Sequence, residues 1–147
     1  MADRKEPYQD PYRAHNFLIE IEGVISGGFQ ECSGLESETD VILYRIGDDK
    51  DNTLKKLPGL KSFSDITLRR GIVDDKSLWD WRKKVMDGKV ERKNVSIIVR
   101  NEEGEEKIRW NIREAWPRKW TGPDLKADGN AVAVETLTFC HEGFDRA

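Results

Sequence analysis

The chain has 147 residues, the length of a single domain that can bury a core without disulfide staples. Its 25 basic and 28 acidic residues leave a net charge of −3, which argues against binding nucleic acid through a broad basic surface. No apolar run approaches the roughly 20 residues that span a bilayer, and the charged N-terminus is not typical of a signal peptide. Both observations predict a chain that folds in the cytosol. With 36% charged and 37% hydrophobic residues, the composition predicts a thin domain that is completed by neighbouring copies.

The first third of the chain predicts extended structure. Residues 1–13 contain two prolines and are expected to form an arm, because proline disfavours helical geometry in itself and in the residue before it. Residues 17–22 alternate apolar and polar side chains, a period of two that is typical of a half-buried strand. Short strands are also expected over residues 29–33 and 36–46.

Residues 47–61, with the sequence GDDKDNTLKKLPGLK, predict a long polar loop. Loops of this length are uncommon inside compact domains and often have a function. The second half is too apolar for a segment that contacts only water, so we expect it to pack against a neighbouring subunit. A disordered surface loop is the alternative. The expected anchors of the contact are Leu54, Leu57, Pro58 and Leu60.

One helix is predicted, over residues 75–86, after a strand over residues 62–71. Asp74 or Asp75 can cap its start by accepting an amide hydrogen bond, and Gly88 is a typical C-terminal stop. Three apolar side chains at helical spacing predict the face that packs on the strands. They are Leu78, Trp81 and Val85.

Three more strands are expected, over residues 95–100, 107–113 and 131–141, with a turn-rich loop over 122–130 before the last of them. In the second, Ile108, Trp110 and Ile112 alternate with polar residues and are expected in the core. The whole chain, residues 1–147, is then one mainly β domain. Its predicted fold is an antiparallel β-barrel or two packed sheets with one flanking α-helix.

Three of these strands carry a polar face opposite an apolar one. Because the apolar face must be buried, the polar face meets water or the inside of an assembly. The polar members are Glu20 and Glu22 on the first strand, Thr67 and Arg69 on the fourth, and Arg109 and Asn111 on the strand over residues 107–113.

The chain shows no constellation of catalytic residues, and we expect no cofactor and no metal. Neither His15 nor His141 accompanies a nucleophile motif, and Cys140 and His141 are neighbours on a strand, so their side chains point to opposite faces. The spacing of histidines and cysteines lacks the pairs typical of zinc sites. Cys32 and Cys140 are expected to be free thiols.

Four blocks of the chain form an ordered series: DPYRAHNFLIEIEG from residue 10, GGFQECSGLE from residue 27, KLPGLKSFSDITLRRGIVDDKSLWDW from residue 56 and NIREAWPRKWTGPDLKADGNAVAVETLTFCHEGF from residue 111. Together they resemble the tail-tube family of T4-like phages and extracellular contractile injection particles. The third block is the most specific, with the pattern K-LPG, ITL-RG and D-S-LW-W. Cys140 departs from the family, which has a small or apolar residue there.

The resemblance implies a β-barrel of two packed sheets whose copies form six-membered rings that stack into a hollow tube. The haemolysin-coregulated protein of type VI secretion shares that architecture. The implied partners are further copies, a sheath protein, baseplate and tube-cap proteins, and cargo in the lumen, without direct membrane or sequence-specific nucleic-acid binding. Assembly is implied in the bacterial cytoplasm, and the tube then becomes part of a phage or injection particle, including particles released from the cell.

The resemblance also gives the candidate surfaces their expected roles. The loop over residues 47–61 is expected to contact another subunit. The charged side chains of the helix are expected to face the sheath, and at least one polar strand face is expected to line the lumen. A wall that mixes both signs of charge suits a conduit, because it avoids a single-sign field that would hold charged cargo. The helix side chains are Asp80, Lys83, Lys84 and Asp87.

Two other functions remain as alternatives. A small-molecule-binding β-barrel carrier needs a large apolar interior, whereas the apolar residues here barely fill a core. An enzyme needs activated groups held together, and none are recognised. The sequence leaves open whether the particle is a phage tail, a bacteriocin or an injection system.

Overall fold

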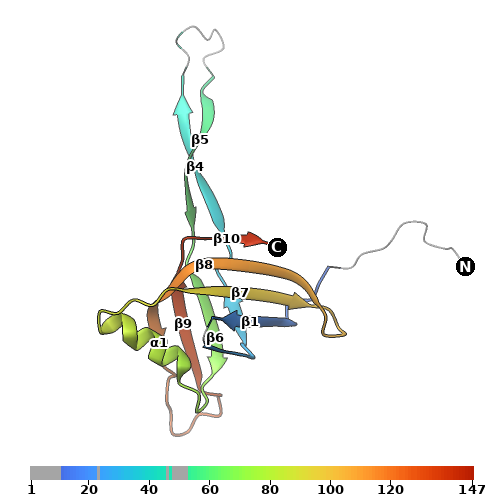
Figure 1. Ribbon diagram of the computed structural model, residues 1–147, viewed down its shortest axis with the longest axis vertical. Helices are drawn as coiled ribbons and strands as arrows, with labels where there is room; N and C mark the ends of the chain where they lie inside the picture. Colours follow the sequence, from blue (N-terminus) through green and yellow to red (C-terminus); the bar gives the residue numbers. More distant parts are fainter. Residues whose placement is uncertain (1–10, 23, 46, 48–52) are drawn as a thin grey trace, which may run out of the picture.

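The computed structural model describes residues 11–22, 24–45, 47 and 53–147, which are mainly β with one helix (Figure 1). In chain order the elements are β1 Phe17–Ile21, β2 Val24–Gly27, β3 Glu31–Ser33, β4 Ser37–Tyr44, β5 Lys55–Phe63, β6 Ile66–Gly71, α1 Ser77–Met86, β7 Lys93–Arg100, β8 Glu106–Thr121, β9 Val134–Cys140 and β10 Gly143–Arg146. All strand pairs are antiparallel.

Two sheets share the long strand β8. Its first half pairs with β7 and β10, and its second half pairs with β9. Glu114 lies between the halves with a φ of 53°, a left-handed conformation that is uncommon outside glycine. We call β2-β1-β7-β8-β10 sheet A and β8-β9-β6-β3 sheet B.

The two sheets run in different directions. In Figure 1 the strands of sheet A cross the molecule, whereas β6 and β9 of sheet B run close to its long axis. The predicted packing of two antiparallel sheets with one helix is confirmed, but the closed barrel is wrong. Among the described residues β3 pairs only with β6, because the chain after β3 leaves the sheet instead of continuing around a barrel.

The core lies between the two sheets and under α1. The inward side chains alternate along the strands, as the period of two predicts; Ile19 and Ile21 of β1 are 0% and 3% exposed. The cluster also contains Ile66 and Leu68 of β6, Val95 and Ile97 of β7, Ile112 and Ala115 of β8, Leu137 and Phe139 of β9, and Leu78 and Trp81 of α1.

Helix α1 ends at Met86, as its sequence predicts, and begins at Ser77, two residues after the predicted start. The Asp75 carboxylate accepts hydrogen bonds from the Ser77 N–H (3.0 Å) and the Ser77 hydroxyl (3.1 Å), which satisfies a free donor at the helix start. Gly88, with a φ of 84°, follows the last turn. Trp81 is 2% exposed, and its indole N–H donates to the Glu91 carbonyl at 2.8 Å. The predicted burial is confirmed for Leu78 and Trp81, while Val85 is half-buried.

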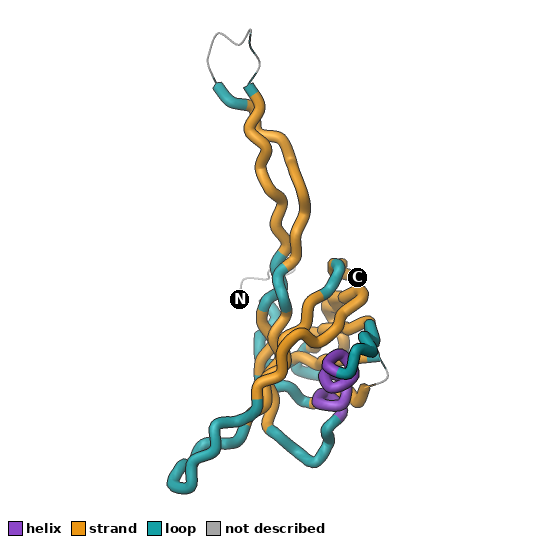
Figure 2. The backbone as a smooth tube through the Cα atoms, turned by 90° about the vertical axis from the view of Figure 1, so that its left-hand side faces the viewer, coloured by secondary structure: helices purple, strands orange, loops and turns teal. Residues whose placement is uncertain are grey.

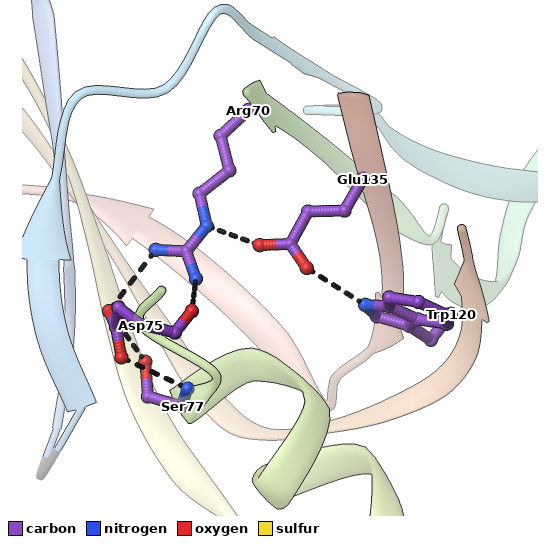
Figure 3. Close-up of polar contacts among 5 residues, drawn as sticks. All are labelled: Arg70, Asp75, Ser77, Trp120 and Glu135. Atoms are coloured by element: carbon purple, nitrogen blue, oxygen red, sulfur yellow. Dashed lines mark hydrogen bonds and ion pairs between the residues drawn. The ribbon is translucent and has the colours of Figure 1, made fainter. Parts of the chain in front are cut away.

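A buried ion pair fastens the start of α1 to sheet B (Figure 3). Arg70 and Glu135 are 5% and 3% exposed, and the Arg70 Nε donates to the Glu135 carboxylate at 2.5 Å. The guanidinium also donates to the Asp75 carbonyl (3.0 Å), and the Trp120 indole N–H donates to the second Glu135 oxygen (3.1 Å). Each hydrogen bond offsets part of the desolvation of the buried charges.

Strands β4 and β5 form a hairpin that projects from the body of two sheets and α1 (Figures 1 and 2). The predicted loop over residues 47–61 is therefore wrong for residues 55–61, which belong to β5; residues 48–52 lie outside the described part. Cross-strand pairing explains the difference, since the apolar end of β4 finds an apolar partner in β5, with Ile42 opposite Leu57. Gly59 sits where the register shifts, and a Cβ there would lie 3.1 Å from the Asp40 carbonyl.

Candidate functional site: the assembly surfaces

The hairpin exposes apolar side chains on both of its faces. All eight residues of β4 are exposed, and the four at its distal end, Val41–Tyr44, are 52–61% exposed. Two-stranded hairpins are marginally stable alone in water, and contiguous exposed apolar surface marks an interaction site. The predicted anchors Leu54, Leu57, Pro58 and Leu60 all lie on this hairpin and are exposed. Sequence reasoning missed Val41–Tyr44 as contact residues, although an unbroken apolar run at a strand end was the available signal.

The outer face of sheet B is rich in hydroxyl groups. Thr67 lies beside Thr138 with their Oγ1 atoms 3.3 Å apart, and Arg69 reaches Glu31 of β3 at 3.4 Å. Cross-strand partners share a face, so the register defines this surface, which we call the threonine face. Its members are Glu31, Ser33, Thr67, Arg69, Lys119, Thr121, Thr136 and Thr138.

The outer face of sheet A, by contrast, is a network of ions. The Arg109 guanidinium donates to Glu106 at 2.6 Å and lies 3.6 Å from Glu20. The hydrogen bond from Arg109 lowers the pKa of Glu106. Nearby, the Asn111 side chain accepts a hydrogen bond from the Ser96 hydroxyl at 3.0 Å. We call this surface the ionic face; its members are Glu20, Ser96, Glu106, Arg109 and Asn111.

The six polar residues predicted for a lumen therefore divide between two surfaces. Glu20, Arg109 and Asn111 are brought together on sheet A, and Glu22 accepts the Asn94 N–H at 3.2 Å at the end of the same strand pair. Thr67 and Arg69 lie on sheet B. Both faces point away from the shared core, and they belong to different sheets.

The outward side of α1 carries charges, including a carboxylate shared by two lysines. Glu91, which follows the helix, accepts hydrogen bonds from Lys84 (2.6 Å) and Lys93 (2.8 Å). These bonds lower the pKa of Glu91 to about 2. The residues expected to face a sheath, Asp80, Lys83, Lys84 and Asp87, are all exposed.

A further apolar surface lies where the body opens between the end of sheet A and β3. It is a groove of about 520 Å³, which we call the edge groove, and the sequence did not reveal it because its lining comes from four separate segments. Ile108 and Trp110, predicted to be core residues, are only half-buried here; of the predicted set, Ile112 alone is fully buried. The apolar lining is mainly Phe17, Leu35, Ile97, Val99, Ile108 and Trp110.

The described residues hold no group of three side chains suited to a metal ion. Burial, with a contribution from Glu31, raises the pKa of the Cys32 thiol to about 11, which makes it unreactive as a nucleophile. His141 is held between the Ser64 carbonyl (2.9 Å) and the Gly143 N–H (3.1 Å). No helix within the described ranges is long and apolar enough to cross a membrane.

Solved structures of contractile injection systems contain chains with this fold. The structure titled as the sheath-tube complex of the extracellular contractile injection system PVC, in its extended state, contains a chain that is 29% identical, with a TM-score of 0.83 over 93% of this chain and 91% of that chain. A chain in the structure titled as the anti-feeding prophage cap is 28% identical, with a TM-score of 0.86 over 98% of this chain and 95% of that chain. Hcp1 from Flavobacterium johnsoniae, at 13% identity and a TM-score of 0.57 over 89% and 94%, shares the fold.

The curated proteins gave no match to the chain. The family model described as T4-like virus tail tube protein gp19 matches residues 13–145, which include both sheets, the hairpin and α1. With this match over nearly its whole length, the protein belongs to the T4-like virus tail tube protein family.

Proposed function

We propose that this protein is the inner-tube subunit of a contractile injection system or contractile phage tail, and that it polymerises as stacked hexameric rings into a hollow conduit for cargo. The observation that carries the proposal is the hairpin. The body buries a hydrophobic core between its sheets, whereas the hairpin extends from it with exposed apolar residues on both faces, a surface that a second copy can cover. Its role is that of a building block and not of an enzyme.

Sheet B is the part suited to close a ring. Its outer strands, β3 and the second half of β8, are sheet edges among the described residues, and an edge strand is stabilised by pairing with another chain. The strands of this sheet run in nearly the same direction as the hairpin (Figures 1 and 2). Lateral pairing of six copies then gives a closed wall whose strands follow the tube axis, with a tilt as in other barrels.

This arrangement assigns the lumen to the threonine face. Its hydroxyl groups and its Arg69–Glu31 pair give a hydrophilic wall without a strong field of one sign. Helix α1 then lies on the outer side, where its charged residues meet a sheath protein. The hairpin reaches the adjacent ring, and rings at the tube ends meet baseplate and cap proteins.

Electron microscopy of the purified protein tests the proposal. Negative staining at high concentration, together with size-exclusion chromatography, should give six-fold rings or tubes. A protein that stays monomeric at every concentration, with no rings in the images, would overturn the proposal and favour the carrier alternative. In cells, assembly is placed in the bacterial cytoplasm, so the same rings should be found in the soluble fraction of a cell lysate.

Cysteine labelling identifies the lumen-lining face. In assembled tubes, Thr67→Cys should react with a small maleimide but be shielded from a bulky one, while Glu20→Cys and Arg109→Cys should behave alike with both reagents. Free subunits, in which all three positions are accessible, are the control. The reverse pattern would assign the lumen to the ionic face.

A further inference from the structure

The edge groove is an apolar surface that the subunit does not fill by itself. Its volume of about 520 Å³ is in the range that accommodates a ligand or several side chains, and its lining is dominated by aromatic and branched aliphatic residues. Trp110 and Ile108 are partly exposed at its wall although their neighbour Ile112 is fully buried. Exposed aromatic side chains in a concave site are typical anchors of protein–protein contacts.

The hairpin presents a face of matching chemistry. The register places Ile42 opposite Leu57 and Tyr44 opposite Lys55, so these four side chains lie on one face of the ribbon. Ile42, Tyr44 and Leu57 are 45–53% exposed. The hairpin extends away from its own body, so this face is free for a second copy (Figure 2).

Charge supports the match. The turn between β7 and β8, next to the groove, holds Glu102, Glu103 and Glu105, and Glu102 lies 3.3 Å from Arg13 of the groove lining. The described residues at the distal end of the hairpin carry the opposite sign, with Lys55 and Lys56 beside the apolar face. Complementary charges around an apolar contact fix its register and raise the association rate.

We propose that the edge groove of one subunit receives the Ile42–Tyr44–Leu57 face of the hairpin of a copy in the adjacent ring, with Lys55 and Lys56 against the acidic turn. This inference rests on the proposed tube and adds the receiving site of the ring-to-ring contact. Ile42, Tyr44 and Leu57 pack against Ile108 and Trp110, which removes apolar surface of both copies from water.

Crosslinking tests which surfaces meet. A Leu57→Cys protein is co-assembled with an Ile108→Cys protein, both carrying Cys32→Ser to remove the native thiol of the groove, and treated with a short bismaleimide. A crosslinked dimer should be the main product in tubes and absent from free subunits. Leu125→Cys, at a position that is 81% exposed outside the hairpin, replaces Leu57→Cys in the matched control and should give no dimer.

Two results would overturn the groove assignment while leaving the tube intact. One is normal tubes in which the Leu57→Cys pair crosslinks no more than the Leu125→Cys control. The other is an efficient crosslink within one chain between Ile108→Cys and Ala2→Cys, which would name the N-terminal segment as the occupant. Absence of any tube from the unmodified protein would instead overturn the proposed function, and the groove contact with it.

Charge reversal tests the electrostatic part independently. Lys55→Glu/Lys56→Glu should fold like the unmodified protein, because both side chains are exposed, but should lose most of its sedimentable polymer. Adding Glu102→Lys/Glu103→Lys to the same chain should restore polymerisation. If the fourfold variant polymerises no better than the lysine double variant, the acidic turn is not the partner of the lysines.

Discussion

The body and the hairpin of this protein are both built from antiparallel strand pairs, but the body buries its apolar side chains and the hairpin exposes them. In the body, strands bury alternate side chains in a shared core, so that β9 alternates between half-buried and fully buried positions along its whole length. In β4 no residue is buried. A strand pair without a core has only its ladder and its cross-strand contacts to hold it together.

This difference indicates that the body determines the stability of the subunit and that the hairpin determines its assembly. Substitutions in the body should change the free energy of unfolding, and substitutions in the hairpin should change polymerisation.

Removing the hairpin should abolish polymerisation and leave a folded monomer. Replacing residues 41–60 by an Asn-Gly turn deletes exposed apolar surface and no core residue, so the melting temperature should change by less than about 4 °C. Circular dichroism melting and sedimentation measure the two properties. Tubes formed normally by this variant would show that the hairpin has no role in assembly, and a large fall in the melting temperature would show that it belongs to the body.

Trp81→Ala should destabilise the body by about 3–5 kcal/mol, since it removes a nearly fully buried indole and leaves a cavity beside Phe139. Urea denaturation followed by far-UV circular dichroism measures the loss. Leu125→Ala, at an exposed position, is the control and should change stability by less than about 0.5 kcal/mol. An unchanged Trp81→Ala protein would mean that α1 does not pack through this residue.

Arg70→Met should cost about 3–5 kcal/mol, because it leaves the Glu135 carboxylate buried without its cation. The double variant Arg70→Met/Glu135→Leu removes both charges and should recover much of the loss. Thermal or urea unfolding of the single and double variants gives the coupling. If the double variant is less stable than either single variant, the expectation that removing both buried charges relieves the cost of an unpaired one is wrong.

The smallest effect concerns the exposed junction of α1 and β7. Lys84 and Lys93 lower the pKa of Glu91 from 4.5 to about 2, so the folded state holds this proton less tightly than the unfolded chain. The stabilisation is therefore complete above about pH 5 and is lost as the pH falls from about 4.5 towards 2. The difference in unfolding free energy between the unmodified protein and Glu91→Gln should shrink over that range. A difference that is independent of pH would show that the lysines do not hold the carboxylate.

Those parts of the body that follow local patterns were predictable from sequence. The alternation around Ile19, the cap at Asp75 and the stop at Gly88 depend on neighbouring residues only. The hairpin was not predictable, because the apolar residues of 41–44 and 54–60 indicate strands only when the two segments are paired across a turn. Considered alone, Pro58 and Gly59 disfavour a strand. The division of the polar residues into two faces also depended on how the sheets pack. The edge groove also depended on how the sheets pack, because its lining residues are close in space but distant in sequence.

Pro58 in the middle of β5 reduces the tendency of the hairpin to aggregate. A long exposed strand pair with apolar side chains is a template onto which other chains can add strands without limit, as in fibrils. Pro58 lacks the N–H that such growth needs, the register shift next to Gly59 distorts the ladder, and Lys55, Lys56 and Lys61 repel a second hairpin of the same kind. The hairpin can therefore dock through its side chains while being a poor seed for fibrils, so that subunits at high concentration in a cell remain available for ordered growth.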